Sequence, residues 1–321
     1  MTFSSSAEKV GDVAIIGAGT MGAGMAVAFA QFGWAVTLVS RRESTIEAAL
    51  VQMSEKIAFL EASDVIPESS RQTIMGRIRT GTDPHDVVPS SRLVVESIVE
   101  DLSVKRAVLS DIENIVGPDC VLSSNTSSLP LGELSGALRR PERFAGFHWF
   151  NPAELVPLVE VIPVSATADA VVTELVKWSR SLCKEPVVVR HDVPGFVANR
   201  LQYALLREAY WLLEQNVCTA EDVDHVLRYG LGARWASMGP FESVDFAGLD
   251  VHLTVADRLF PLLSCADTAP SALRTAVASG ALGVKSGRGL CGTYKPEAVA
   301  RRRAAQARTL AALERLARGD S

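Results

Sequence analysis

The sequence predicts an α/β protein with an N-terminal doubly wound parallel sheet and an all-α C-terminal domain. In the first part of the chain, short apolar runs alternate with stretches of helical spacing, which is the βαβ pattern of a parallel sheet. After Pro194-Gly195, helical spacing dominates and strand candidates almost disappear. We therefore predict two domains, residues 1–192 and 193–321.

The apolar runs predicted as strands are Val13–Ile16, Val36–Val39, Leu93–Ser97, Val121–Ser124, Phe144–Trp149, Pro157–Ile162 and Val187–Val189. A first helix is expected to end near Phe32, and others to cover Glu43–Ala62, Ser69–Arg79 and Val104–Ile115. The stretch Glu297–Arg318 is rich in Ala and Arg. Because Glu and Leu interleave with its arginines, we expect an amphipathic surface helix there and not a nucleic-acid contact.

Composition narrows the function classes. The chain has 321 residues, 48% apolar and 21% charged, an ordinary globular composition that suits about two domains. Its net charge of -5 favours small-molecule partners over nucleic acid. The five cysteines have neither metal-ligand spacing nor the even number of a disulfide scaffold. We see no secretory signal and no apolar segment long enough to cross a bilayer, so we expect a cytoplasmic protein with no metal and no membrane partner.

A glycine-rich loop follows the first predicted strand. Gly17, Gly19 and Gly22 fit G-x-G-x-x-G, with Thr20 and Met21 between them, and the loop opens a helix. Gly17 would allow a tight turn, Gly19 a close approach to a pyrophosphate and Gly22 close helix packing. The helix N-terminus supplies N–H groups and positive potential for phosphates. The pattern indicates a dinucleotide cofactor; the alternative is a glycine turn without a ligand.

The end of the second predicted strand bears on the choice of cofactor. Where NAD enzymes usually carry an acidic residue for the ribose hydroxyl, this chain has Ser40, followed by Arg41 and Arg42. A carboxylate would repel the 2′-phosphate of NADP, whereas serine and guanidinium groups would bind it. We therefore favour NADP(H) over NAD(H). The alternative is that the two arginines belong to a solvated loop.

The candidate acid/base is His148, at the end of a predicted strand, with Glu160 twelve residues later in the next one. If the strands are neighbours, the carboxylate can reach the imidazole, fix its tautomer and stabilise the imidazolium. Hydride transfer from an alcohol needs a base for the hydroxyl proton, and histidine titrates in the right range. A lone histidine is more often structural, but further polar clusters lie at suitable places.

These clusters follow strand ends or open the second domain. They are Asn125–Ser128, Glu100–Lys105 and Asn199. In open α/β sheets, ligands bind beyond the carboxyl ends of the strands, where serine and asparagine can contact a reacting oxygen. The alternatives are helix capping for Asn199 and a serine turn for Ser127.

The chain resembles the L-3-hydroxyacyl-CoA dehydrogenase superfamily over nearly its whole length. The matching segments are GAGTMGAGMA, VVESIVEDLSVK, SSNTSSLP, FAGFHWFNPAELVPLVEVIP, DVPGFVANRL and MGPFESVDFAGLD. The resemblance implies a Rossmann-like domain, a helical domain that forms most of a homodimer interface, and a catalytic pair at His148 and Glu160. It also places Ser127 and Asn199 at the substrate oxygen, and Glu100 and Lys105 near the nicotinamide. We expect Asn125 to be a further cofactor-binding residue.

Two departures from that family concern the substrate. CoA-using members carry a lysine-rich stretch where this chain reads KIAFLEASDVIPESS, which is poor in cations. The segment Gly230–Pro240 is longer than usual and looks like the branch with L-gulonate 3-dehydrogenase, carnitine 3-dehydrogenase and a pyridine-carboxylate dehydrogenase of vitamin B6 breakdown. We infer that Arg234 in this segment clamps a substrate carboxylate, the alternative being a surface salt bridge. The turn with Lys285 and Arg288 resembles a family turn that we interpret as structural.

Three hypotheses about function follow. The first is a dehydrogenase that acts on the alcohol or ketone group of a small 3-hydroxy acid or related carboxylate. The second is a 3-hydroxyacyl-CoA, or carrier-bound 3-hydroxyacyl, dehydrogenase. The third is a non-catalytic nucleotide-binding protein, against which the intact set of His148, Glu160, Ser127 and Asn199 argues.

Overall fold

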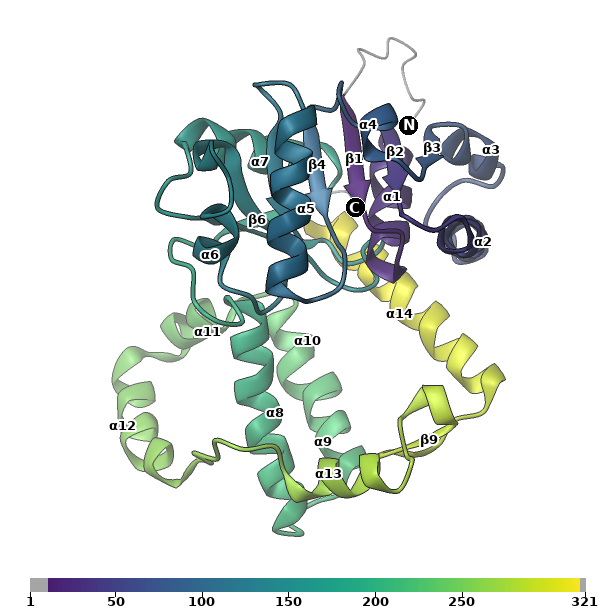
Figure 1. Ribbon diagram of the computed structural model, residues 1–321. Coiled ribbons are helices and arrows are strands. Elements are labelled where there is room, and N and C mark those ends of the chain that lie inside the picture. The colour runs from purple at the N-terminus through teal and green to yellow at the C-terminus, as the bar shows by residue number, and fades with distance from the viewer. Residues whose placement is uncertain (1–10, 318–321) are drawn as a thin grey trace. The chain divides into compact units, whose positions relative to one another are not determined.

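The computed structural model describes residues 11–317, which form two compact units. One unit holds the described residues up to Val197 together with those from Ala304 on, and the second holds Ala198–Arg303. The sequence placed the whole C-terminal stretch in the second domain, whereas the end of the last helix belongs to the first unit. Figure 1 follows the chain from purple to yellow.

The first unit is built on an eight-stranded sheet of order β3-β2-β1-β4-β5-β6-β7-β8. Its strands are parallel except where β7 pairs antiparallel with β6. The strands are β1 (Asp12–Ile16), β2 (Ala35–Val39), β3 (Ile78–Gly81), β4 (Leu93–Glu96), β5 (Val121–Ser124), β6 (Phe144–Trp149), β7 (Leu158–Pro163) and β8 (Glu185–Val188). The predicted doubly wound sheet is confirmed.

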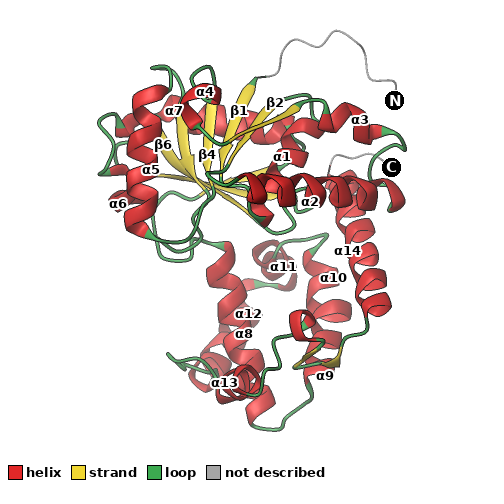
Figure 2. Cartoon of the chain, turned by 45° about the vertical axis from the view of Figure 1, so that its right-hand side comes forward, coloured by secondary structure: helices red, strands yellow, loops and turns green. Residues whose placement is uncertain are grey.

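Helices cover both faces of this sheet (Figure 2). They are α1 (Thr20–Gln31), α2 (Glu43–Ala62), α3 (Ser70–Met75), α4 (Pro84–Val87), α5 (Leu102–Ile115), α6 (Leu131–Ser135), the 3-10 turn η1 (Pro141–Arg143) and α7 (Asp169–Ser181). Successive residues of β1 point to opposite faces. Ile15 accordingly packs in the apolar cluster of α1, α2 and α7, and Ile16 in that of α5 and α6. The first unit therefore has a core on each side of its sheet.

The second unit is helical, as the sequence predicts. Its elements are α8 (Ala198–Glu214), α9 (Ala220–Val226), the π-helical η2 (Leu227–Leu231), α10 (Gly232–Trp235), α11 (Pro240–Ala247), α12 (Leu249–Leu259), η3 (Phe260–Leu262), α13 (Ser271–Ala278), η4 (Val284–Ser286) and the short strands β9 (Arg288–Gly289) and β10 (Gly292–Thr293). The last helix, α14 (Pro296–Ala317), begins in this unit and ends in the first. Arg318, the predicted end of that helix, lies outside the described residues.

One predicted element is wrong. The stretch Ser69–Arg79 was expected to be helical throughout, but α3 ends at Met75 and strand β3 starts at Ile78. Gly76 interrupts the helix, and β3 pairs in parallel with β2 at the edge of the sheet. Because an edge strand has solvated positions, β3 lacks the continuous apolar run that marks the inner strands. Helix α7 was not predicted at all.

Candidate active site at the carboxyl edge of the sheet

The glycine loop joins β1 to α1, as expected. Gly17 has φ of +118°, and a Cβ atom on it would lie 2.3 Å from the carbonyl oxygen of Ser97. A Cβ atom on Gly22 would lie 1.9 Å from the carbonyl oxygen of Gly17. Both positions therefore exclude a side chain. Above Gly19, by contrast, a Cβ atom would meet nothing within 4 Å, so the loop is open on the side from which a ligand would approach.

The start of α1 suits a phosphate group. Gly19 is the N-cap residue and gives no side-chain cap to the first turn of the helix, in which Thr20 is exposed and Met21 half-buried. N–H groups in an uncapped first turn are donors for anions, and the helix dipole favours negative charge there. The residues present therefore fit the pyrophosphate of a dinucleotide.

The residues expected to select the cofactor follow β2. Ser40 is half-buried, and its backbone N–H donates to the carbonyl oxygen of Gly81 at 3.2 Å. Arg41 and Arg42 are exposed, and Arg42 is the N-cap residue of α2. No carboxylate stands at position 40, so no negative charge on that side chain would oppose a phosphate.

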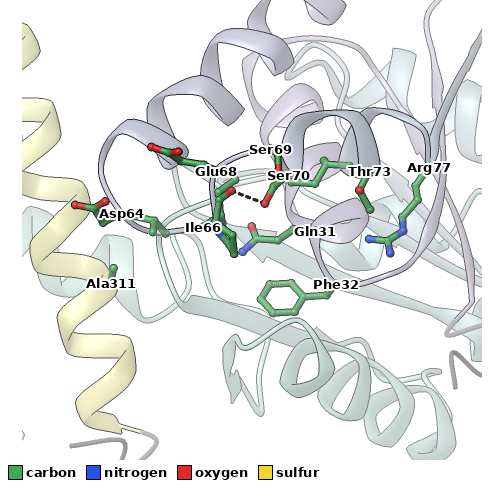
Figure 3. Close-up of a pocket in the computed structure, with 13 residues that line it drawn as sticks. Gln31, Phe32, Asp64, Ile66, Glu68, Ser69, Ser70, Thr73, Arg77 and Ala311 are labelled. Carbon is green, nitrogen blue, oxygen red and sulfur yellow. Dashed lines mark hydrogen bonds between the residues drawn. The ribbon is translucent and has the colours of Figure 1, made fainter. Parts of the chain in front are cut away.

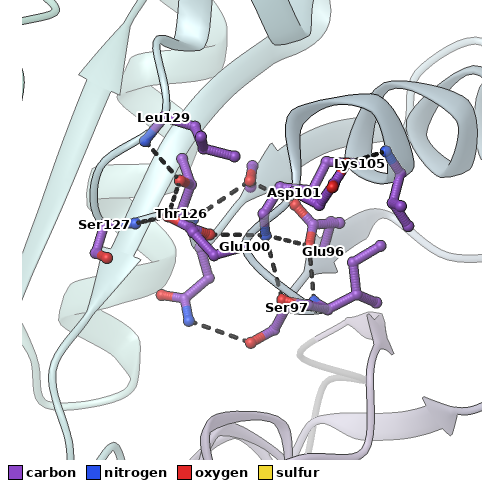
Figure 4. A network of polar contacts seen from close by, with 12 residues as sticks. Glu96, Ser97, Glu100, Asp101, Lys105, Thr126, Ser127 and Leu129 are labelled. Atoms are coloured by element: carbon purple, nitrogen blue, oxygen red, sulfur yellow. Dashed lines mark hydrogen bonds and ion pairs between the residues drawn. The ribbon is translucent and has the colours of Figure 1, made fainter.

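A buried ion-pair network occupies the end of β4 (Figure 4). The ammonium of Lys105 lies 2.7 Å from Glu96 Oε1 and 3.3 Å from Glu100 Oε2. The Lys105 and Glu96 side chains are 1% and 0% exposed, respectively. Glu96 also accepts hydrogen bonds from the Ile98 N–H and the Ser124 hydroxyl. Lys105, predicted to border the nicotinamide, is thus enclosed between two carboxylates.

Glu100 holds the loop that follows β5. Its Oε1 accepts from the Thr126 hydroxyl, from the N–H groups of Ser127 and Ser128, and from the Ser128 hydroxyl at distances of 2.5–3.2 Å. Burial by itself would raise the pKa of Glu100, but the Thr126 hydrogen bond, the charge of Lys105 and the Ser127 and Ser128 bonds outweigh it, so this pKa is lowered. Glu100 is therefore a carboxylate that fixes the backbone of Ser127, while the Ser127 side chain stays exposed.

Asn125 connects three strand ends. Its amide nitrogen donates to the Ser97 hydroxyl at 3.2 Å, and its Oδ1 accepts from the Trp149 N–H at 2.8 Å. Ser97 follows β4 and Trp149 ends β6, next to His148. Asn125 thus ties the glycine-loop side of the edge to the strand that carries the histidine.

The predicted pair of His148 and Glu160 is formed. The two residues are direct partners in the antiparallel register of β6 and β7, and the distance from Nδ1 to Glu160 Oε2 is 2.8 Å. Both side chains are buried, at 6% and 1% exposure. Glu160 Oε1 accepts from the Val197 N–H at 3.0 Å. With Nδ1 committed to the carboxylate, Nε2 is the nitrogen that remains for proton exchange with a substrate.

Aromatic rings enclose the imidazole. The Phe150 ring centroid lies 4.4 Å from that of His148, and the Phe196 centroid lies 5.4 Å away. Phe196 has a positive φ of +49°, uncommon for a bulky residue, after Gly195 at +79°. This turn places the Phe196 ring against His148 and the next N–H on Glu160. The pair is thus kept largely dry, which strengthens its electrostatic interaction.

The remaining predicted residues belong to the second unit. Asn199 lies in the first turn of α8 and is half-buried, and Arg234 lies on α10 and is exposed. Lys285 and Arg288 are exposed in the turn of η4 and β9. The first unit therefore assembles the glycine loop, Asn125, Glu100, Ser127 and the His148 pair, while the roles of Asn199 and Arg234 stay predictions.

Sequence reasoning missed two buried charged residues around this site. Glu96 was assigned only as part of a strand, although a glutamate that ends the apolar run of β4 signals a partnered charge. Lys184, just before β8, donates to the carbonyl oxygens of Ala153 and Val156, both at 2.8 Å. Lys184 thereby anchors the loop between His148 and Glu160, which no local pattern indicates.

Other features lie apart from this edge. A pocket of about 560 Å³ is lined by the end of α1, the α2–α3 connection, α3 and Ala311 of α14, and no predicted site residue lines it (Figure 3). Among residues 11–317, no group of three or more His, Cys, Asp or Glu side chains is placed to hold a metal ion. No helix in that part of the chain is long and apolar enough to span a bilayer.

Comparison with known proteins decides the family. Residues 12–193 match the 3-hydroxyacyl-CoA dehydrogenase NAD binding domain, and residues 195–292 match the 3-hydroxyacyl-CoA dehydrogenase C-terminal domain. The chain belongs to the 3-hydroxyacyl-CoA dehydrogenase family. It is a nicotinamide-dependent oxidoreductase that transfers a hydride, which confirms the predicted family and reaction type.

Similar proteins within the family act on two substrate classes. The chain is 38% identical to 5-formyl-3-hydroxy-2-methylpyridine 4-carboxylate 5-dehydrogenase of Mesorhizobium japonicum, over 96% of this chain and 98% of that one. It is 39% identical to human mitochondrial hydroxyacyl-coenzyme A dehydrogenase, over 80% and 82% of the two chains.

Solved structures give the same picture. A structure of 5-formyl-3-hydroxy-2-methylpyridine 4-carboxylic acid 5-dehydrogenase, described as an NAD+-dependent dismutase, superposes with a TM-score of 0.87 at 36% identity, covering 97% of this chain and 99% of that one. (S)-3-Hydroxybutyryl-CoA dehydrogenase from Ralstonia eutropha gives 0.70 at 32% identity, covering 88% and 99%.

Proposed function

We propose that the protein interconverts the alcohol and carbonyl forms of a small molecule that bears a free carboxylate, with His148 as the acid/base. The hydrogen bond from His148 to Glu160 carries the chemistry, because it leaves Nε2 as the proton-exchanging atom. The substrate class is supported by the 38% identity to a pyridine-carboxylate dehydrogenase over 96% of the chain.

In this mechanism each residue has a distinct task. During oxidation, His148 Nε2 takes the hydroxyl proton, and Glu160 stabilises the imidazolium that forms. The Val197 N–H keeps Glu160 in position. The hydroxyl of Ser127 and the amide of Asn199 donate hydrogen bonds to the reacting oxygen. The nicotinamide, when bound, supplies the hydride acceptor.

Arg234 is proposed to bind the substrate carboxylate, because a guanidinium can make two parallel hydrogen bonds to it. Replacing it with methionine keeps an unbranched apolar side chain and removes the charged guanidinium. Arg234→Met should raise KM for carboxylate substrates about 100-fold or more while kcat changes little, since a lost charged hydrogen-bond pair is worth about 3 kcal/mol. An unchanged KM would remove Arg234 from the site.

The second candidate is a 3-hydroxyacyl-CoA dehydrogenase, favoured by the 39% identity to the human mitochondrial enzyme. A spectrophotometric panel at ~340 nm separates the two, because reduced nicotinamides absorb there and oxidised ones do not. Acetoacetyl-CoA is compared with small keto acids and with aldehyde- or ketone-bearing aromatic carboxylates, each with NADH and NADPH. The first proposal expects a higher kcat/KM on a free acid, and turnover confined to the thioester would reject it.

For the cofactor we propose a preference for NADP(H), supported by the absence of a carboxylate at Ser40 and by the exposed Arg41 and Arg42. The alternative is a preference for NAD(H), because the similar 5-formyl-3-hydroxy-2-methylpyridine 4-carboxylic acid 5-dehydrogenase is NAD+-dependent. Ser40→Asp should raise KM for NADPH at least tenfold and leave KM for NADH nearly unchanged, because the new carboxylate repels only the 2′-phosphate. Equal KM values for the two wild-type reactions would reject the preference.

We further propose a homodimer formed through the helical unit, in a cytoplasmic protein. None of the described residues from 198 to 303 is buried. Large apolar side chains are instead exposed, Phe241 at 85% and Phe246 at 77%. Exposed apolar surface on this scale marks an interface. Light scattering should give the mass of two chains, and a monomer at micromolar concentration would contradict the proposal.

A further inference from the structure

The strand order gives Glu96 a special place. The chain leaves β1 for β2 on one side, and β4 pairs with the other side of β1. The crevice beyond the carboxyl ends of β1 and β4 is therefore the switch point, where open α/β sheets bind their ligands. Glu96 is the last residue of β4 and pairs in register with Ile16. The glycine loop begins directly after Ile16, at Gly17.

Glu96 thus lies close to the glycine loop, and the backbone of Ser97 separates it from Gly17. Ser97, its neighbour, places its carbonyl oxygen against Gly17, so that even a Cβ atom would not fit there. On its other side Glu96 pairs in register with Ser124 of β5, whose hydroxyl it accepts. The charge of Glu96 can act on a bound cofactor at this edge through electrostatic interaction, without direct contact.

The network around Glu96 carries a net negative charge. Glu96 and Glu100 contribute two carboxylates, and Lys105, the cation that pairs with both, contributes one ammonium. The other donors to these carboxylates are N–H and hydroxyl groups, which are neutral. The sum is one excess negative charge. Glu96 and Lys105 are almost fully buried, whereas Glu100 is 37% exposed, so solvent and salt screen this charge only in part.

The two forms of a nicotinamide differ by one charge, because the oxidised ring is a cation and the reduced ring is neutral. We propose that Glu96 is a positioning and charge-setting residue that makes the site bind the oxidised nicotinamide more tightly relative to the reduced one. The bound equilibrium then shifts toward the alcohol and the oxidised cofactor. The inference rests on the proposed function only for its nicotinamide, not for the substrate class.

Calorimetric titration of the full-length protein without substrate tests the inference. The dissociation constants of NAD+ and NADH, or of NADP+ and NADPH if those bind tighter, are measured for the wild type and for Glu96→Gln. The ratio of the oxidised to the reduced constant should rise roughly fivefold in the variant, the scale of one partly screened charge. A purely structural role would weaken both forms by the same factor, and an unchanged ratio would overturn the inference.

Matched variants isolate the charge. Glu113 is also a buried glutamate, at 2% exposure, but it pairs with Arg143 away from this edge, so Glu113→Gln should leave the ratio unchanged. Ser124→Ala removes a hydrogen bond to Glu96 without changing the charge, and it should also leave the ratio unchanged. A ratio that rises as much in Ser124→Ala as in Glu96→Gln would assign the effect to packing and overturn the inference.

If Glu96→Gln does not fold, Glu100→Gln carries the same test, because Glu100 is 37% exposed and contributes the second carboxylate. It too must raise the ratio, and an unchanged ratio there would overturn the inference. A wild-type protein that binds neither form would contradict the proposed function. An unchanged ratio with normal binding contradicts this inference alone.

Discussion

Two clusters of polar side chains lie at the same edge of the sheet, and they differ in whether they leave an atom available to a substrate. In the pair of His148 and Glu160, one imidazole nitrogen is committed and the other remains for a proton. In the network of Glu96, Lys105 and Glu100, the ammonium is enclosed by carboxylates that also accept backbone and hydroxyl donors. The first can exchange a proton with a substrate; the second can only position groups and set charge.

The largest expected effect is at His148. Replacing it with glutamine keeps a polar side chain but removes the imidazole that would exchange a proton with the substrate. We expect kcat to fall about 10³-fold with cofactor affinity retained, the usual scale for general acid/base catalysis. His191→Gln, a change at an exposed histidine, serves as control. A His148→Gln enzyme that keeps its turnover would show that the pair is structural.

The next effect is at Glu160, whose role is to orient the ring and stabilise the imidazolium. Glu160→Gln should lower kcat about 10²-fold and change KM little, because the carboxylate acts most strongly when the imidazole is charged. The matched control is Glu185→Gln, in the neighbouring strand β8 and exposed. A Glu160→Gln loss confined to KM would instead assign Glu160 to substrate binding.

For the network of Glu96, Lys105 and Glu100, we expect substitution to lower stability. Lys105→Met leaves Glu96 buried without its cation, and the free energy of unfolding should fall by about 3–5 kcal/mol. Breaking the exposed pair of Arg140 and Glu142 by Arg140→Met should lower the free energy of unfolding far less, because solvent screens that pair. Urea unfolding followed by circular dichroism measures both, and equal losses would contradict the comparison.

The smallest effect concerns pH. The pKa of Glu100 in the folded protein lies below its usual 4.5, so its stabilisation is present above pH 4.5 and is lost as pH falls through the folded pKa. Below pH 4.5 the melting temperature of the wild type should therefore fall more steeply than that of Glu100→Gln, because the glutamine side chain takes up no proton there. Parallel curves for the two proteins would show that Glu100 is not held as a carboxylate.

Local sequence patterns could predict the strands whose residues are nearly all buried. The strands β1, β2, β4 and β5 were predicted because both of their faces are buried, which produces an unbroken apolar run. The edge strand β3 was missed because its positions are partly solvated. The His148 pair was predictable because its two residues are only twelve positions apart in the sequence, on adjacent strands joined by a short loop.

The network was less predictable because its members come from three separate segments. Glu96 lies 28 residues before Ser124 and nine before Lys105, and their contact depends on which strands become neighbours. A sequence gives the order of the strands along the chain, whereas the order within the sheet results from packing. The contact of Ser124 with Glu96 follows from that order, because β5 lies beside β4.

The glycine loop, the alternation of strands and helices and the candidate pair of His148 and Glu160 could all be predicted from the sequence, because each depends on residues close in the chain. The position of β4 beside β1, which brings Glu96 close to the glycine loop, is visible only in the folded chain. The same is true of the contact between the Phe196 ring and the imidazole of His148. The physical reason is that burial and charge pairing depend on which distant segments meet, and packing of the whole sheet settles that.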